Sequence, residues 1–349
     1  MADFGGWDMP IEYPADLGGG VLNEHQAVRD SVGVFDVSHL GKLEVSGIGS
    51  KDFLNSILTN DLGRIKDGQA QYSMLCDPAD GGVVDDLIVY QRSIDRFLLI
   101  PNAANAASVL ARLQSSATSE ISIEDRHLDF AVIAIQGPRS FEVMRELGFT
   151  ADLDYMSFAE IELSGISAIV CRTGYTGELG FEILPKWSDA NHIWSSIVEI
   201  LPKYGGLIAG LGARDTLRTE MGYPLHGHEL SLEITPVQAG ANWAVGWNKD
   251  AFWGKEILAN ERAIGAKRIL RAFKLLDRGI PRAGMDIYRD EERVGTLTSG
   301  TFSPTLKIGI GIGLVDPEVK LGEVIEIDVR GRKLRAEVVK LPFVPSRVR

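Results

Sequence analysis

Gly81-Gly82-Val83-Val84-Asp85-Asp86-Leu87-Ile88-Val89-Tyr90 places two adjacent carboxylates inside an apolar run that is typical of a β-strand. Side chains of a strand alternate between its faces, so Asp85 and Asp86 are predicted to point to opposite sides. On this alternation one face carries Val84, Asp86, Ile88 and Tyr90, and the other carries Val83, Asp85, Leu87 and Val89. A buried ionised carboxylate costs several kcal/mol unless it is paired or hydrogen-bonded. The pair therefore indicates either a functional site or the wet end of a strand that leaves a solvated turn.

The segments around this strand predict an antiparallel sheet with helices on one face, because strands and helices do not alternate as in βαβ units. The order is strand, helix, three strands, helix, over residues 41–48, 51–58, 71–75, 83–90, 96–101 and 103–113. An apolar run at 130–135 and a helix at 140–147 follow. The next section reads as three strands and two helices, at 160–163, 168–172, 180–184, 188–201 and 214–221.

The character of the chain changes near residue 250. Short β-like runs then recur between Gly, Pro and Asp residues, at 271–276, 285–289, 293–298, 309–314, 324–329 and 333–339. Such spacing predicts a small barrel or sandwich. With 349 residues in total, two or three domains are expected.

Composition narrows the function classes. With 48 acidic and 36 basic residues the formal charge is −12, which argues against a general binder of nucleic acid or anionic membranes. No apolar stretch approaches the roughly 18–20 residues of a membrane span. The start lacks the basic leader and apolar run of a signal peptide. Cys76 and Cys171 are expected to be reduced, buried thiols of a cytoplasmic enzyme.

Two glycine-rich segments are candidate binding loops. In the first, residues 173–182, glycines surround Tyr175, and Glu182 interrupts the apolar strand that follows. Taken alone, this pattern favours a tight hairpin turn over a ligand site. The second, residues 210–218, lacks the third glycine and the parallel-strand context of a dinucleotide loop. Its Arg214 lies near a helix N-terminus, which is unfavourable for a cation and hints at another purpose. Arg218 follows one turn later, where Glu220 could pair with it.

Three further motifs give weaker signals. His226-Gly227-His228-Glu229 has no third clustered ligand, so a metal site is not expected. In Phe35-Asp36-Val37-Ser38-His39 a Ser adjacent to a His is no evidence of a triad, and Asp36 is interpreted as a capping or orienting residue. The hydroxyl-rich segment 298–306 suits an ordered loop packed on another domain, and we assign no chemistry to it from sequence.

Taken in order, seven motifs closely resemble the aminomethyltransferase family, the T-proteins of the glycine cleavage system. They lie at residues 6–10, 35–39, 81–90, 135–138, 172–178, 210–218 and 298–306, so the resemblance spans almost the whole chain. One departure is that the family usually has a longer segment before the Gly-Trp motif, so an N-terminal edge is expected to be either missing or built differently.

The resemblance implies an α+β fold: a three-domain cloverleaf around a central folate cavity, with antiparallel sheets, helices and a C-terminal β-barrel. Domain 1 is expected to be discontinuous, over residues 1–40 and 138–249. Domain 2, a ferredoxin-like insert, is expected over 41–137, and domain 3, the barrel, over 250–349.

The activity that the resemblance implies is the transfer of a methylene carbon to tetrahydrofolate. The donor is an aminomethyl group on the dihydrolipoyl arm of the H-protein, and the products are ammonia and 5,10-methylenetetrahydrofolate. By the same resemblance Asp86 matches the catalytic carboxylate, with Asp85 as its structural neighbour. The folate-binding positions match Tyr72, Asn102, Tyr175, Glu182 and Arg214. Glu182 suits the N–H donors of the pterin, and Arg214 suits its acceptors.

Two relatives of this family are the alternatives. A folate-dependent demethylase would share the cavity but need no lipoyl carrier. The folate-binding paralogue of iron–sulfur maturation carries a Lys-Gly-Cys-Tyr-type motif, whereas this chain has Arg172-Thr173-Gly174-Tyr175. A docking patch for an acidic carrier would need local positive charge, and the candidates are the basic residues Lys333, Arg335, Arg347 and Arg349.

Overall fold

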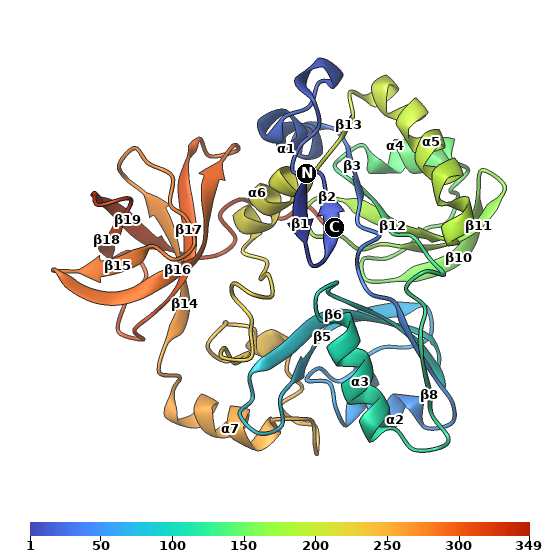
Figure 1. Cartoon of the computed structure of the whole chain (residues 1–349), viewed down its shortest axis with the longest axis horizontal. Helices are drawn as coiled ribbons and strands as arrows, with labels where there is room; N and C mark the ends of the chain where they lie inside the picture. The colour runs from blue at the N-terminus through green and yellow to red at the C-terminus, as the bar shows by residue number, and fades with distance from the viewer.

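The computed structural model describes residues 1–349, apart from the side chain of Leu17. Two sheets, a barrel and a short N-terminal hairpin make up the chain, and Figure 1 shows the barrel to one side of the two sheets. The hairpin consists of β1 (Ala2–Phe4) and β2 (Trp7–Met9). None of the described helices combines the length and the apolar composition that crossing a membrane requires.

The first sheet has six strands in the order β10-β11-β12-β9-β3-β13, and only β13 pairs in parallel, with β3. Its strands are β3 (Gly33–Asp36), β9 (Ile133–Gln136), β10 (Phe158–Leu163), β11 (Ile166–Cys171), β12 (Gly180–Pro185) and β13 (Leu207–Ile208). The helices of this part are α1 (Val21–Asp30), α4 (Ser140–Glu146), α5 (Ala190–Ile200) and α6 (Leu211–Met221). Apolar residues of α4 and α5 form one core cluster with β9, β11 and β12.

The second sheet contains the strand with the two aspartates. It is antiparallel, in the order β5-β6-β7-β4-β8. Its elements are β4 (Leu43–Ser46), α2 (Ser50–Asn55), β5 (Gln69–Cys76), β6 (Val83–Ser93), β7 (Arg96–Pro101), α3 (Ala106–Ser116) and β8 (Ser122–Asp125). The structure differs from the ferredoxin-like expectation in its number of strands. A βαββαβ unit has four strands, whereas this sheet has five, because three strands (β5, β6 and β7) lie between its two helices.

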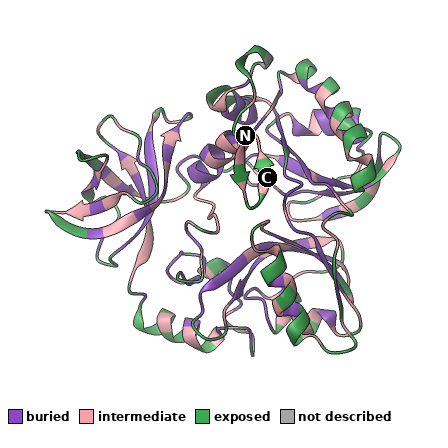
Figure 2. Cartoon of the chain, in the orientation of Figure 1, coloured by how far each residue is buried: buried purple, intermediate pink, exposed green. Residues whose placement is uncertain are grey.

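The two sheets meet through a shared apolar cluster that includes Phe35 of β3, Tyr90 of β6 and Phe158 of β10. Buried segments therefore run through the middle of both sheets, while the outer faces of the helices are exposed (Figure 2). This meeting of sheets gives β6 a buried face toward the centre of the molecule. Helices α2 and α3 cover the other face of the second sheet.

The C-terminal part is a closed six-stranded barrel, as the β-rich spacing indicated. Its strands are β14 (Ile269–Leu275), β15 (Asp286–Arg289), β16 (Glu292–Ser303), β17 (Ile308–Val315), β18 (Val324–Asp328) and β19 (Lys333–Val339). Helix α7 (Lys255–Ile264) precedes it, and its Leu258 packs against Met74 and Val83 of the second sheet.

The chain order of these sheets bears on the predicted domain division. Strand β9 falls inside the predicted insert 41–137, yet it pairs with β3 and β12 of the first sheet. We therefore propose that the first domain resumes before β9 rather than at residue 138. The other predicted boundaries stay proposals.

A bulge changes the expected alternation at the start of β6. Leu75 pairs with Asp85 and Cys76 pairs with Val83, which leaves Val84 as the extra residue. Val84 consequently packs in the same cluster as Leu87 and Val89. The prediction that Val84 shares a face with Asp86 was wrong for this reason, whereas Asp86, Ile88 and Tyr90 do line one side together.

Candidate functional site

A cavity of about 610 Å³ lies where the two sheets meet. All six residues predicted to form the site line it: Tyr72, Asp86, Asn102, Tyr175, Glu182 and Arg214. Asp85, the expected structural neighbour, does not line it and has no exposed surface. Among the described residues that line the cavity, none comes from the barrel.

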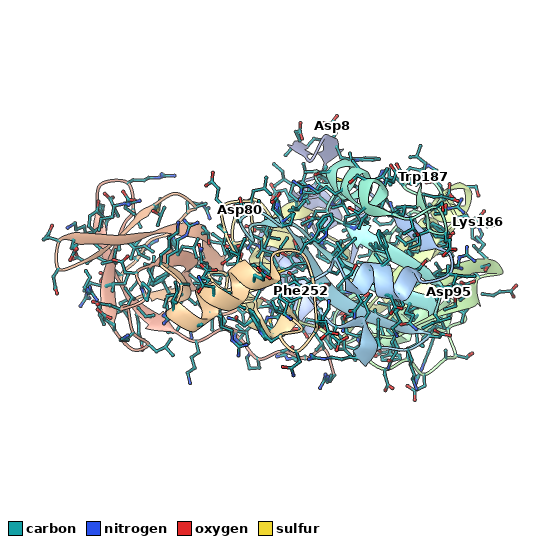
Figure 3. All side chains as sticks on the ribbon, turned by 90° about the horizontal axis from the view of Figure 1, so that it is seen from below. Asp8, Asp80, Asp95, Lys186, Trp187 and Phe252 are labelled. Atoms are coloured by element: carbon teal, nitrogen blue, oxygen red, sulfur yellow. The ribbon has the colours of Figure 1, made fainter. Side chains whose placement is uncertain are left out.

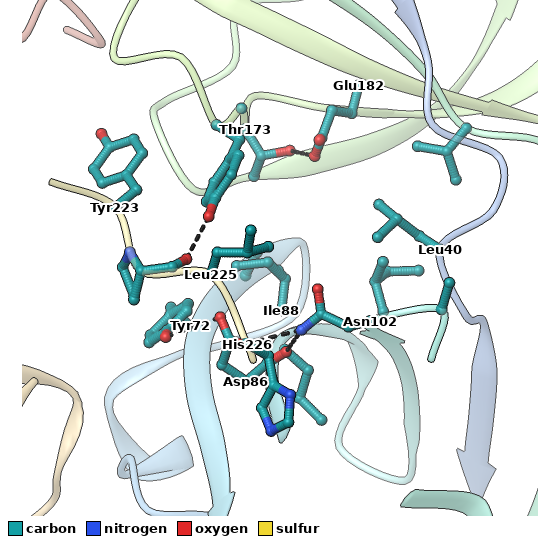
Figure 4. A pocket seen from close by; sticks show the side chains of 18 of the residues that line it. Leu40, Tyr72, Asp86, Ile88, Asn102, Thr173, Glu182, Tyr223, Leu225 and His226 are labelled. Atoms are coloured by element: carbon teal, nitrogen blue, oxygen red, sulfur yellow. Dashed lines mark hydrogen bonds between the residues drawn. The ribbon is translucent and has the colours of Figure 1, made fainter. Parts of the chain in front are cut away.

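Asp86 is fixed by two donors. The Tyr72 hydroxyl donates to its Oδ2 at 3.0 Å, and the Asn102 side-chain nitrogen donates to its Oδ1 at 2.9 Å (Figure 4). Burial raises the pKa of Asp86 above its ordinary 3.8, while the Tyr72 hydrogen bond, the charge of His226 and the Asn102 hydrogen bond oppose that rise. The result is an oriented carboxylate in a site where charge is weakly screened.

Asp85 points away from the cavity and binds the start of the segment that leads to α3. Its carboxylate accepts hydrogen bonds from the Asn102 backbone N–H (2.9 Å), the Asn102 side chain (2.9 Å) and the Asn105 side chain (2.7 Å). Burial and the charge of Asp86 raise the pKa of Asp85 to about 7, against these donors. Asp85 therefore holds Asn102, and Asn102 in turn holds Asp86.

Glu182 and Arg214 form the second polar group of the cavity. Figure 4 shows Glu182 on the wall opposite Asp86, where the Thr173 hydroxyl donates to its Oε2 at 2.5 Å. Burial raises the pKa of Glu182, and Thr173 and the charge of Arg214 counteract it. Burial also lowers the pKa of Arg214, against the opposing effects of Tyr175 and Glu182. This wall thus offers an anionic acceptor near a cationic donor fork.

Two contacts made by aromatic rings complete the walls. The Arg214 guanidinium lies 4.6 Å from the centroid of the Tyr175 ring, a cation–π contact, and the Tyr175 hydroxyl donates to the Pro224 carbonyl. On the other side Tyr72 stacks on Trp243 at 5.1 Å between centroids. Because Trp243 lines the cavity and yet is 64% exposed, it marks the opening of the cavity to solvent.

Sequence reasoning missed several lining residues. His39 and Trp243 both contribute to the walls, together with Asn60, Tyr155 and Tyr223. The predicted motif 35–39 contained His39 but gave it no role; burial lowers its pKa to about 3, so the imidazole is neutral near pH 7. Trp243 carried no signal, because an aromatic residue between short turns is as typical of a core as of a cavity.

The other predicted roles are resolved by contacts. Arg218 does not pair with Glu220: it pairs with Asp215 and Glu229, while Glu220 pairs with Arg29. His226 and His228 each contact a backbone carbonyl, of Val83 and Thr298 respectively. The described residues contain no group of three or more His, Cys, Asp or Glu side chains that could hold a metal ion. Asp36 accepts from the Ser38 backbone N–H at 2.9 Å, an orienting contact of the expected kind.

Comparison with known proteins agrees with this geometry. Residues 1–249 match the family described as GCVT N-terminal domain, and residues 268–345 match the glycine cleavage T-protein C-terminal barrel domain. An aminomethyltransferase of Parafrankia sp. (strain EAN1pec) is 55% identical over 346 residues, covering 99% of this chain and 94% of the relative. One of Mycobacterium bovis is 51% identical over 351 residues, covering 100% and 94%.

A solved structure extends the similarity to the fold. Glycine cleavage system aminomethyltransferase T from Bartonella henselae superposes with a TM-score of 0.91 at 32% identity, covering 99% of this chain and 94% of that one. Sequence motifs, sheets, barrel and cavity thus lead to one conclusion. The chain belongs to the aminomethyltransferase family, the T-proteins of the glycine cleavage system.

Proposed function

We propose that this chain transfers the methylene carbon of an aminomethyl group, carried on the dihydrolipoyl arm of the glycine cleavage H-protein, to tetrahydrofolate. Ammonia and 5,10-methylenetetrahydrofolate are the products. The observation that supports this proposal is that one cavity holds two polar groups. Asp86 is fixed on one wall, and Glu182 and Arg214 lie on another.

Recognition of tetrahydrofolate is assigned to Glu182 and Arg214. The amino-pyrimidine edge of a pterin presents adjacent N–H donors, which suit a buried carboxylate, and its carbonyl suits a guanidinium. The Tyr175 ring contacts the Arg214 guanidinium and so helps to hold it in place. Asn102 is one of the expected folate-binding residues. Since its side-chain nitrogen already donates to both aspartates, we assign the contact with the folate to its side-chain oxygen.

The chemistry requires a negative charge near the reacting carbon. N5 and N10 of tetrahydrofolate each form a bond to the methylene carbon, and the bonds from this carbon to the amine nitrogen and to sulfur break. The two N–H protons balance the released ammonia and the restored thiol. The carbon passes through an iminium-like cation, which an oriented carboxylate stabilises without reorganising. Asp86 is proposed for this role, because Tyr72 and Asn102 fix its direction.

The carrier and the compartment remain proposals. Three of the four basic residues expected to meet an acidic carrier have acidic neighbours: Lys333 contacts Glu291 and Glu326, Arg335 contacts Asp277, and Arg347 contacts Glu178. The fourth, Arg349, lies 5.8 Å from the centroid of the Tyr155 ring. These pairs give no support to the last domain as the docking surface. Cys76 and Cys171 are free and buried, which supports the predicted reducing, cytoplasmic setting.

The test is ammonia release from aminomethyl-loaded H-protein mixed with the purified chain. We expect release that depends on tetrahydrofolate and yields 5,10-methylenetetrahydrofolate. A parallel assay replaces the loaded carrier with free methylated amines, thioethers or ethers. Formation of methylfolate in that arm, with no ammonia from the carrier, would assign the chain to the demethylase alternative instead.

A further inference from the structure

Two motifs to which the sequence gave no chemistry meet in the structure. They are residues 226–229, which follow α6, and residues 298–306 of the barrel. The Thr298 hydroxyl lies 2.5 Å from Glu229 Oε1, and the Thr298 carbonyl lies 2.7 Å from His228 Nδ1. The same hydroxyl lies 3.1 Å from the Ile312 carbonyl, so the carboxylate is its closer acceptor. The barrel therefore contacts the segment after α6 through polar atoms.

Glu229 is the centre of this contact. Its side chain has no exposed surface, and three different parts of the chain donate to it. Besides Thr298 of the barrel, the donors are Arg218 Nη1 of α6 at 2.9 Å and the Leu225 backbone N–H at 3.1 Å. A buried carboxylate is tolerated only with such partners, so the three parts are fixed relative to one another.

Arg218 strengthens the same junction from the helix side. Its Nη2 donates to the Ser299 hydroxyl of the barrel at 2.8 Å, and its Nε donates to Asp215 at 2.9 Å. The guanidinium is 2% exposed, so it needs these acceptors. Helix α6 also carries Arg214, one turn earlier, on the cavity wall.

The segment held by Glu229 forms part of the cavity. We call residues 223–229 the wall loop; its members Tyr223, Pro224, Leu225, His226 and His228 all line the cavity. The Pro224 carbonyl accepts the hydrogen bond of the Tyr175 hydroxyl. Contacts thus run without a break from Thr298 through Glu229 and the wall loop to Tyr175, whose ring carries the Arg214 guanidinium.

We propose that Thr298 and Glu229 are positioning residues for folate binding: the barrel, which contributes no lining residue among those described, sets the position of the wall loop and of Tyr175 through this carboxylate. The inference rests on the proposed function, because it assigns the wall occupied by Tyr175 and Arg214 to the pterin. Loss of the Thr298 hydroxyl leaves Glu229 short of a donor and lets the wall loop shift.

The experiment compares Thr298→Val with Thr301→Val by calorimetric titration of tetrahydrofolate. Thr301 is a matched control, since it is buried on the same strand and its hydroxyl contacts only the Phe302 carbonyl. We expect T298V to bind tetrahydrofolate about threefold to tenfold more weakly, the size of the net contribution of one hydrogen bond. T301V should bind like the unmodified chain. Thr298→Ser, which keeps the hydroxyl, should restore binding.

A purely structural role predicts a different result. T298V would then melt at a lower temperature than the unmodified chain, yet bind with unchanged affinity when fully folded; that outcome overturns the proposal. A double-mutant cycle with Tyr175→Phe tests the path itself. Losses that add independently would overturn it, because residues on one path are expected to be non-additive. If the unmodified chain binds no tetrahydrofolate, the proposed function fails instead.

Discussion

The side-chain nitrogen of Asn102 lies 2.9 Å from Oδ1 of Asp86, and the same nitrogen lies 2.9 Å from Oδ1 of Asp85. One amide group therefore links the carboxylate in the cavity to the carboxylate behind it. Adjacent residues of a strand point to opposite faces, and the link is possible because Asn102 follows Pro101, the last residue of β7, which pairs with Leu87 of β6. The cavity carboxylate is fixed by its buried neighbour through a shared donor.

Asp86→Asn should keep most of the affinity for tetrahydrofolate and lose most turnover. The side chain keeps its shape but loses the charge that is proposed to stabilise the cationic carbon. Loss of one electrostatic group of this kind typically slows turnover by about 10²–10³-fold. The measurement is ammonia release from aminomethyl-loaded H-protein at saturating tetrahydrofolate. An undiminished rate would remove Asp86 from the mechanism.

The matched control is Asp80→Asn, which makes the same chemical change in the exposed turn before β6 (Figure 3). Asp80 accepts only a local hydrogen bond from the Gly82 backbone N–H. Its variant should turn over at the rate of the unmodified chain. Equal losses in both variants would indicate a general effect on β6 rather than chemistry at Asp86.

As the pH is lowered, the rate of the reaction should begin to fall at a higher pH than it would if Asp86 had the ordinary pKa of an aspartate. Catalysis needs ionised Asp86, and burial raises its pKa above 3.8, so protonation begins earlier as the pH falls. Because Asp85 and Asp86 interact, the fall of the rate at acidic pH reflects the titration of both carboxyl groups together. The check is a profile of kcat/KM measured from about pH 4 to about pH 8. A rate that stays flat down to the ordinary aspartate range would contradict this.

Glu182→Ala and Arg214→Ala should each weaken tetrahydrofolate binding by about 1–3 kcal/mol, the usual loss when a buried polar partner is removed. Calorimetric titration measures the affinity directly. Each variant leaves Asp86 and its donors in place, so turnover at saturating folate should fall less than the affinity. Unchanged affinity in both variants would refute the assignment of this wall to the pterin.

Glu220 should give the chain a pH-dependent contribution to its stability. Burial alone would raise the pKa of Glu220, but hydrogen bonds from His25 and Ser303 and the charge of Arg29 lower it to about 2. A carboxyl with a lowered folded-state pKa stabilises the fold above its ordinary 4.5, and this contribution is lost as the pH falls from 4.5 toward 2.

The comparison for this prediction is Glu220→Gln. Its free energy of unfolding in urea should lie about 3 kcal/mol below that of the unmodified chain at neutral pH, from the size of the pKa difference. The gap should narrow as the pH falls below 4.5, where the unmodified chain begins to lose the same contribution. A gap independent of pH would show that ionisation of Glu220 does not stabilise the fold.

Local pattern predicted most of the fold. Alternation located β6 and set Asp85 and Asp86 on opposite faces, although only the family resemblance pointed to Asp86 as the cavity residue. The β-rich spacing after residue 250 predicted the barrel. The face on which Val84 lies was predicted wrongly, because a bulge breaks the two-residue period of the strand and nothing in the sequence marks the extra residue. Strand β9 was assigned to the insert because pairing with β3 joins residues about a hundred positions apart.

The site was predicted less completely, for a related reason. Arg218 and Glu220 looked like partners, but residues two apart on a helix point in different directions. Their actual partners, Glu229 and Arg29, are brought in by other elements. The six predicted site residues came from the family resemblance, and the cavity gathers them all. Their neighbours His39 and Trp243 depend on how the sheets meet, which local sequence does not specify.

Trp243 offers an optical reading of the cavity. Its indole is 64% exposed and stacks on Tyr72, whose hydroxyl holds Asp86, so the emission of one of the six tryptophans depends on what stands beside the carboxylate. Entry of a ring system at this opening will displace water from the indole and shift or quench its fluorescence. Filling and emptying of the site can therefore be followed in real time without attaching a dye.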